Sequence, residues 1–177
     1  MIEKGDYIMI DDKYAVDYDI DFNWENTFIS DCKDNLMKIA PSKLALLNAE
    51  NHTIVVTDRY LFPNFKAKKH ENKYEKDLLT LLEGCGVKKI IYCSDKIDNL
   101  GLYRRVVNTL SQKSIAVTHN KKIEKFHDRF WYCPETEKCI CFGTSLNGIG
   151  KAICLISELE ESDVITLKNY FNKAGIL

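Results

Sequence analysis

The chain has 177 residues, of which 45% are hydrophobic and 29% are charged, and its formal net charge is −1. This length and composition are typical of one folded domain with its own hydrophobic core, and they exclude a disordered or fibrous chain. A net charge so close to zero excludes a general attraction to nucleic acid or anionic lipid. Any contact with a polyanion must therefore come from a local group of basic residues.

The sequence contains no apolar run close to the ~20 residues that cross a bilayer, and its polar N-terminus lacks the apolar stretch of a signal peptide. We therefore expect a cytoplasmic protein with reduced cysteines. The seven cysteines form no C-x-x-C pair, and most lie in apolar runs, which indicates small buried residues. Cys133, Cys139 and Cys141 flank one turn, but a fourth ligand at zinc spacing is missing, so we expect no metal site.

Residues 1–50 are predicted to form a small N-terminal extension. Two short strands in it have the pattern of a hairpin, residues 6–10 and 14–20. Residues 24–47 are predicted to be mostly helical, with an interruption at Pro41 and with Ser42 as the cap of a helical turn. This part of the chain carries no motif that indicates a chemical function.

From residue 51 the sequence alternates between strands and helices. Apolar or β-branched runs predict three strands, at residues 53–57, 87–93 and 114–118. Apolar residues at helical spacing predict two helices between them, at residues 74–82 and 100–110. This order predicts parallel strand pairing with helical crossovers.

A lysine-rich stretch, residues 65–76, separates the first of these strands from the first helix. We interpret it as a surface loop, which is either simply solvated or a patch that attracts phosphate. The basic residues in it are Lys66, Lys68, Lys69, His70, Lys73 and Lys76.

After residue 123 the pattern changes to an antiparallel hairpin, with strands at residues 125–133 and 139–143 around a turn. One more strand is predicted at residues 152–157, and a closing helix at 163–171, capped by Ser162. Residues 51–177 are thus predicted to form a single α/β domain, a mixed β-sheet flanked by helices on both faces. In such sheets ligands bind beyond the carboxyl ends of the strands.

Polar residues that suit a phosphate group gather around the hairpin. His127 and Arg129 share one face of its first strand, because side chains at i and i+2 point the same way. The segment after its second strand contains Ser145 and Asn147 at the same spacing, among three glycines that let the backbone approach a ligand. With Lys151, all these side chains can donate hydrogen bonds to oxygen, so the sequence predicts a phosphate pocket.

His127-Asp128-Arg129 and Gly143-Thr144-Ser145-Leu146-Asn147 resemble the two motif segments of phospholipase D-like enzymes, His-x-Lys and Gly/Ser-x-Asn. The His-Asp-Arg form is similar to a divergent module at the C-terminus of MIT-domain proteins and in bacterial relatives. In that group a strand ending in Asp-x-Tyr precedes the first helix, as Asp58-Arg59-Tyr60 does here. The resemblance implies a phospholipase D-like fold and, for bacterial relatives, a component of a defence system.

The resemblance also implies a metal-independent phosphodiesterase without a cofactor, in which His127 forms a phosphohistidine intermediate. The implied catalytic residues are His127, Arg129 and Asn147, and the implied phosphate-binding residues are Thr144, Ser145, Lys151 and Arg59. The family reaction uses two histidines, and this chain carries one half-motif. A catalytic form is therefore expected to be a homodimer.

Two departures from the family pattern leave the activity open. Arg129 stands where the family has lysine, and Pro134, beside Glu135, stands where the family has the aspartate that orients the histidine. One interpretation is a phosphodiesterase, with nucleic acid as the favoured substrate. The alternative is an inactive phosphate-binding or interaction subunit of a larger assembly, with nucleic acid or a phospholipid head group as ligand. Asp58 and Arg59 are equally open between an ion pair with each other and a part in the site.

Overall fold

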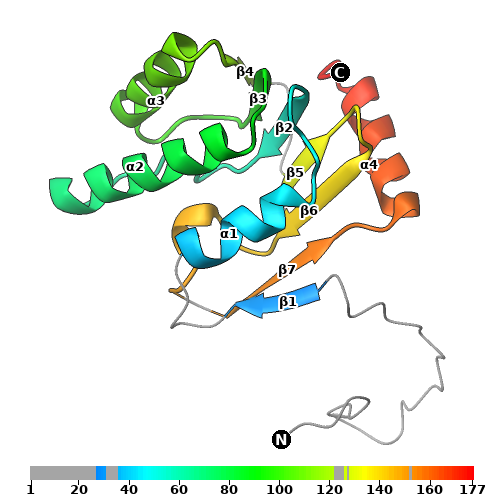
Figure 1. Cartoon of the computed structure of the whole chain (residues 1–177), viewed down its shortest axis with the longest axis horizontal. Coiled ribbons are helices and arrows are strands. Elements are labelled where there is room, and N and C mark those ends of the chain that lie inside the picture. Colours follow the sequence, from blue (N-terminus) through cyan, green and yellow to red (C-terminus); the bar gives the residue numbers. More distant parts are fainter. Residues whose placement is uncertain (1–26, 31–35, 122–125, 127, 152) are drawn as a thin grey trace, which may run out of the picture.

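A computed structural model describes residues 27–30, 36–121, 126, 128–151 and 153–177. In this part of the chain seven strands form one sheet, in the order β1-β7-β6-β5-β2-β3-β4 (Figure 1). The strands are β1 (Thr27–Ser30), β2 (Thr53–Thr57), β3 (Lys89–Cys93), β4 (Ala116–Asn120), β5 (Arg129–Cys133), β6 (Lys138–Phe142) and β7 (Cys154–Glu158). The helices are α1 (Leu36–Ala45), α2 (Lys68–Gly84), α3 (Leu100–Gln112), the short 3₁₀ helix η3 (Leu146–Gly148) and α4 (Glu161–Lys173).

The sheet is mixed, as predicted. The strands β2, β3 and β4 are parallel, with α2 and α3 as the connections between them. The strands β5 and β6 form the predicted antiparallel hairpin, and β5 also pairs antiparallel with β2. The carboxyl end of β2 therefore lies beside the first residues of β5, since antiparallel neighbours run in opposite directions.

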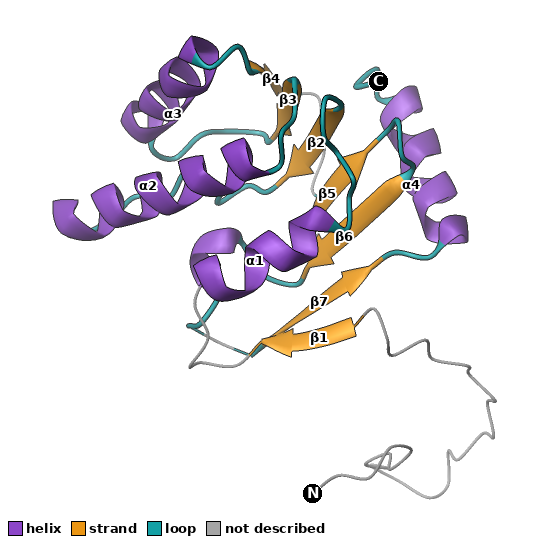
Figure 2. Cartoon of the chain, viewed as in Figure 1, coloured by secondary structure: helices purple, strands orange, loops and turns teal. Residues whose placement is uncertain are grey.

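Helices cover both faces of the sheet, which confirms the predicted layering (Figure 2). Ile54 and Val56 of β2 and Trp131 of β5 face one side and pack into a core that includes residues of α1, α2 and α3. Val55 and Tyr132 face the other side and pack with residues of α4. This alternation follows from the two-residue period of a strand, and it explains why the central strands read as nearly continuous apolar runs.

The structure differs from the prediction before residue 51. Residues 24–47 were expected to be mostly helical, but β1 is a strand that pairs antiparallel with β7. The helix α1 continues through Pro41 instead of stopping there, and Ser42 donates a hydrogen bond to the carbonyl of Ile39 (3.0 Å) within the helix rather than capping it. A proline removes one N–H donor from a helix, and burial of four α1 side chains compensates here. Both elements belong to the sheet or its core. The hairpin predicted for residues 6–20 lies outside the described residues.

Two helices begin earlier than predicted. The stretch 65–76 was expected to be a loop, but α2 starts at Lys68, because lysine and glutamate are good helix formers and Tyr74 and three leucines anchor the inner face. The helix α4 starts at Glu161, so Ser162 lies in its first turn, and the N-cap residue Glu160 makes no side-chain capping bond.

The six described cysteines are free thiols, and four of them are buried, as expected of small core residues. Trp131 is fully buried. Among the described residues, no helix combines the length and apolar character needed to cross a membrane. The same residues contain no group of three or more histidine, cysteine, aspartate or glutamate side chains placed to hold a metal ion.

Candidate phosphate site

A buried carboxyl group lies at the carboxyl end of β2, where two loops that are far apart in the sequence meet. Asp58 directly follows β2 and its side chain has no exposed surface. One carboxyl oxygen, Oδ1, accepts a hydrogen bond from the backbone N–H of Tyr60 (3.0 Å). The other oxygen, Oδ2, accepts from the backbone N–H of Leu146 (3.2 Å), at the start of η3. Asp58 therefore joins the loop after β2 to the loop after β6.

The environment of Asp58 brings its titration close to neutral pH. Complete burial raises the pKa of Asp58 from 3.8 to about 6, because the charged form loses its hydration. The neighbouring Ser145 hydroxyl, the backbone N–H groups of Tyr60 and Leu146 and the positive charge of Arg129 act in the opposite direction and lower this pKa. The carboxyl group thus changes charge near pH 6 beside a guanidinium group.

The loop after β6 brings three of the predicted residues together around one backbone carbonyl. The hydroxyl of Ser145 donates to the carbonyl oxygen of Tyr60 (3.0 Å), and Nδ2 of Asn147 donates to the same oxygen (3.2 Å). The Nζ of Lys151 donates to Oδ1 of Asn147 (2.9 Å). Ser145 is buried, and its Oγ lies 3.3 Å from Nδ2 of Asn147. These donors hold the Tyr60 loop in place in this structure.

A pocket of about 270 Å³ opens next to this network. It is lined by Thr57, Arg59, Tyr60, Phe126, Asp128 and Arg129. Tyr60 is 43% exposed, and the centre of its ring lies 5.3 Å from the guanidinium carbon of Arg59 and 6.0 Å from that of Arg129. Arg59 follows β2 and Arg129 opens β5, so the antiparallel pairing of these strands brings both guanidinium groups to one place. Two arginines against one aspartate give the lining a net positive charge.

The structure divides the predicted residues into two groups. Arg59 and Arg129 line the pocket, whereas Thr144, Ser145, Asn147 and Lys151 lie outside its lining. His127 lies outside the described residues, and both of its neighbours in the chain, Phe126 and Asp128, line the pocket.

Packing, rather than the approach of a ligand, accounts for two glycines of the loop after β6. A Cβ on Gly143 would lie 3.1 Å from the carbonyl oxygen of Leu155 on the neighbouring strand. A Cβ on Gly148 would lie 2.2 Å from the hydroxyl oxygen of Thr144. Gly150 has φ +77°, a backbone conformation that favours glycine.

The ion pair considered between Asp58 and Arg59 is not formed. Nη1 of Arg59 instead donates to Oδ1 of Asp95 (2.6 Å), in the loop after β3. The salt bridge holds Arg59 at the pocket and leaves Asp58 to the two backbone N–H groups. The sequence does carry a signal for Asp58, since an acidic residue directly after a buried strand must find partners at the end of the sheet.

Glu135 does not supply the carboxylate that the hairpin lacks at Pro134. Its Oε1 accepts a hydrogen bond from the backbone N–H of Thr53, at the start of β2. Arg129 and the pocket lie at the other end, where Thr57 pairs with Phe130. The buried carboxyl group beside Arg129 is that of Asp58, contributed by a different strand.

No family model matches this sequence, and no curated protein matches it. A solved structure that matches is that of TrmBL2, an archaeal chromatin protein described as showing a novel mode of DNA binding, with 16% identity and a TM-score of 0.42. The match covers 87% of this chain and 54% of the other, so this chain spans about half the length of that protein.

Proposed function

We propose that this chain is a phospholipase D-like domain that holds a phosphodiester between Arg59 and Arg129, with nucleic acid as the favoured ligand. The observation that carries the proposal is the convergence of two guanidinium groups on one pocket beside a buried carboxyl group. A guanidinium group can bind two phosphate oxygens at once, and a pocket with two of them attracts the negative charge of a phosphodiester. The sequence motif around His127 supplies the family resemblance.

In the catalytic form of this proposal, a ring nitrogen of His127 attacks phosphorus and the bond to the leaving oxygen breaks. A second histidine, from a partner copy of the chain, gives its proton to that oxygen. Water then attacks the phosphohistidine, which releases the second product and restores the imidazole. Arg59 and Arg129 stabilise the negative charge on the phosphoryl oxygens during both steps.

A second candidate function is binding of the phosphodiester without turnover, as a subunit of a larger assembly. Two observations favour it over catalysis. Ser145 and Asn147 direct their donors at the carbonyl of Tyr60 instead of the pocket. Glu135, the acidic residue beside Pro134, is held at the opposite end of β2.

Cleavage in the presence of a chelator separates the two functions. The purified protein is incubated with plasmid, single-stranded DNA and RNA in EDTA, beside His127→Ala and the matched control His52→Ala. The residue His52 precedes β2, at the end of that strand away from the pocket. Cleavage that survives EDTA, is lost in His127→Ala and persists in His52→Ala supports the enzyme. Sedimentation provides a second check, because two-histidine chemistry requires a dimer.

Binding measurements decide the case in which no cleavage occurs. Arg129→Ala is expected to weaken binding of a labelled oligonucleotide by about tenfold or more, since a charged hydrogen-bonding group is lost. The control is Arg104→Ala, an exposed arginine of α3. Equal affinity in both variants and the wild type would reject the pocket as a phosphate site.

A further inference from the structure

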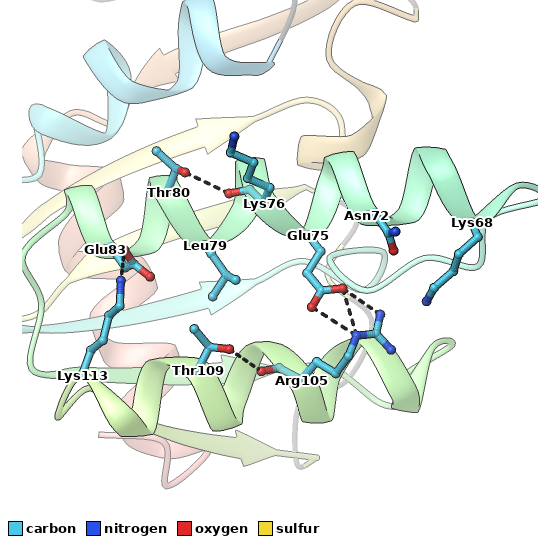
Figure 3. Close-up of a pocket in the computed structure, with 10 residues that line it drawn as sticks. All are labelled: Lys68, Asn72, Glu75, Lys76, Leu79, Thr80, Glu83, Arg105, Thr109 and Lys113. Atoms are coloured by element: carbon cyan, nitrogen blue, oxygen red, sulfur yellow. Dashed lines mark hydrogen bonds and ion pairs between the residues drawn. The ribbon is translucent and has the colours of Figure 1, made fainter.

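The charges of α2 are sorted onto different sides of the helix. Residues 66–76 contain five lysines and two glutamates, which gives this stretch a charge of +3. Both glutamates face α3, where Nη2 of Arg105 binds Glu71 (2.7 Å) and Glu75 (2.8 Å). Figure 3 shows the Arg105 guanidinium group against the Glu75 carboxylate. Arg105 of the neighbouring helix therefore neutralises both acidic side chains, and Lys68 of α2 also binds Glu71.

The outward side of α2 carries lysines. Lys69, Lys73 and Lys76, named here the lysine face, recur at i, i+4 and i+7 and so share one side of the helix. They are exposed and lie away from the buried Tyr74 and Leu78. Lys73 binds Asp77 (2.9 Å), whereas Lys69 and Lys76 make no ion pair with a described carboxylate.

The lysine face begins at the same edge of the sheet as the pocket. The helix α2 follows the loop that carries Arg59 and Tyr60, and the hydroxyl of Tyr74 donates to the carbonyl of Leu61 (2.9 Å), which ties the first turns to this loop. In Figure 1 the arrow of β2 points toward the side of the molecule on which the first turns of α2 lie. From Lys69 to Lys76 the helix rises about 10 Å, a length that spans more than one phosphate of a nucleic-acid strand.

We propose that the lysine face binds backbone phosphates of a nucleic-acid strand whose phosphodiester occupies the pocket between Arg59 and Arg129. The inference rests on the proposed function and adds the substrate class: a polynucleotide, which extends past the pocket, rather than a single phosphate ester. With a net charge of −1 on the whole chain, such a local patch is required for any attraction to a polyanion.

A groove of about 670 Å³ between α2 and α3 continues the polar surface beside Lys76 (Figure 3). It is lined by Lys68, Asn72, Glu75, Lys76, Leu79, Thr80, Glu83, Arg105, Thr109 and Lys113. Its second acidic residue, Glu83, is bound by Lys113 (2.5 Å), just as Glu75 is bound by Arg105. The carboxylates in the groove thus have counter-charges of their own, and they oppose a nearby phosphate backbone only weakly.

The same features disfavour an anionic membrane as the partner. A helix that binds a bilayer inserts apolar side chains beside its basic residues. The apolar side of α2 is instead buried in the core, through Tyr74, Leu78, Leu81 and Leu82. Leu79, which lines the groove with Lys76, packs partly buried against the core, and none of the exposed large hydrophobic side chains of the described residues lies on α2. Contact with phosphates is therefore the chemistry that the lysine face offers.

The test compares two triple variants with equal loss of charge. Lys69→Gln/Lys73→Gln/Lys76→Gln removes the lysine face, and Lys88→Gln/Lys89→Gln/Lys173→Gln removes three exposed lysines elsewhere. Binding of a long labelled oligothymidine and of a thymidine dinucleotide is measured over a range of salt concentrations. Each lost phosphate contact reduces the slope of log K against log salt by roughly 0.7, so the first variant is expected to lose about 2. Its affinity for the oligomer is expected to fall about tenfold or more at low salt, with dinucleotide binding unchanged.

Equal slopes and affinities in the two triple variants would overturn the proposal. So would a lysine-face variant that loses binding to phosphatidylserine vesicles and keeps its affinity for the oligomer. Failure of the pocket has a different signature: Arg129→Ala then binds the oligomer like the wild type, while the lysine-face variant still binds it more weakly.

Discussion

The buried carboxyl group of Asp58 makes the stability of the fold depend on pH, and Asp58→Asn isolates this effect. The asparagine keeps the size of the side chain and never carries a charge. In asparagine an NH₂ group replaces one of the two carboxyl oxygens. Because NH₂ cannot accept a hydrogen bond, the backbone N–H of Tyr60 or of Leu146 loses its acceptor in the variant. A lost buried hydrogen bond costs about 1–3 kcal/mol at every pH. The charge effect, in contrast, appears only where Asp58 ionises.

The size and sign of the charge effect follow from the pKa of Asp58, which burial raises from 3.8 to about 6. The folded protein keeps this proton up to about pH 6, whereas the unfolded chain releases it near its ordinary pKa. Protonation of Asp58 therefore favours the folded state below pH 3.8, and this contribution is lost as the pH rises to about 6. A pKa difference of one corresponds to roughly 1.4 kcal/mol, so the total is about 3 kcal/mol.

The assay is urea unfolding of the wild type and of Asp58→Asn at several values between about pH 4 and pH 8. The free energy of unfolding of the variant minus that of the wild type is expected to rise by about 2 to 3 kcal/mol over this range. The rise is expected mainly below the folded-state pKa of about 6. A difference that stays constant with pH would show that Asp58 is either solvated or always neutral, and it would refute the argument.

Three further predictions concern the same loops and α2. Gly148→Ala places a Cβ 2.2 Å from the Thr144 hydroxyl, so we expect a cost of about 1–3 kcal/mol in urea unfolding, with recovery in the double variant Gly148→Ala/Thr144→Ala. A bound phosphate competes with Asp58 for Arg129 and so raises the pKa of Asp58 further. The affinity for an oligonucleotide, measured by anisotropy, is therefore expected to fall as the pH rises through about 6. Asp58→Asn is expected to lose this pH dependence. Arg105→Gln leaves Glu75 without its cation and leaves Glu71 with Lys68 alone, so we expect a loss of about 1 kcal/mol in unfolding free energy that shrinks at high salt.

The central sheet was predictable because burial on both faces leaves a local signal. Residues 53–57 were predicted as a strand with the bounds that β2 has, since a β-branched run of this length suits a buried strand. The hairpin of β5 and β6 was predictable from alternation and its turn. The pairing of β1 with β7 was not, because a ladder between residues 27–30 and 154–157 leaves no trace in either segment alone.

The start of α2 was missed for a different physical reason. A helix is recognised in a sequence by apolar residues at helical spacing, and the first such residue of α2 is Tyr74. The six residues before it, from Lys68 on, are all polar or charged. They are helical because the downstream anchor and their own propensity propagate the helix. This segment carries Lys69 and Lys73, two of the three residues of the lysine face.

The residues of the candidate site could be predicted from the sequence, but the partners that their side chains bind could not. Ser145 and Asn147 were expected side by side because of their i, i+2 spacing, and they do lie side by side, across the turn into η3. That turn points their donors at the carbonyl of Tyr60, more than eighty residues earlier in the chain. Sequence spacing describes neighbours within one segment, so it has no means of showing a partner on another loop.

The buried acidic residue whose pKa is lowered by the charge of Arg129 is Asp58, which follows β2, and not a residue of the hairpin. The hairpin has proline where the family pattern has aspartate, and Glu135 beside it is fixed by Thr53 at the wrong end of β2. Asp58, at the right end, combines complete burial, two backbone donors and the nearby charge of Arg129. A carboxyl group in that setting can take up or release a proton near pH 6, and it is fixed by the loops after β2 and β6. In this fold, the buried acidic group near the hairpin arginine therefore comes from the carboxyl end of β2, the strand that pairs antiparallel with β5.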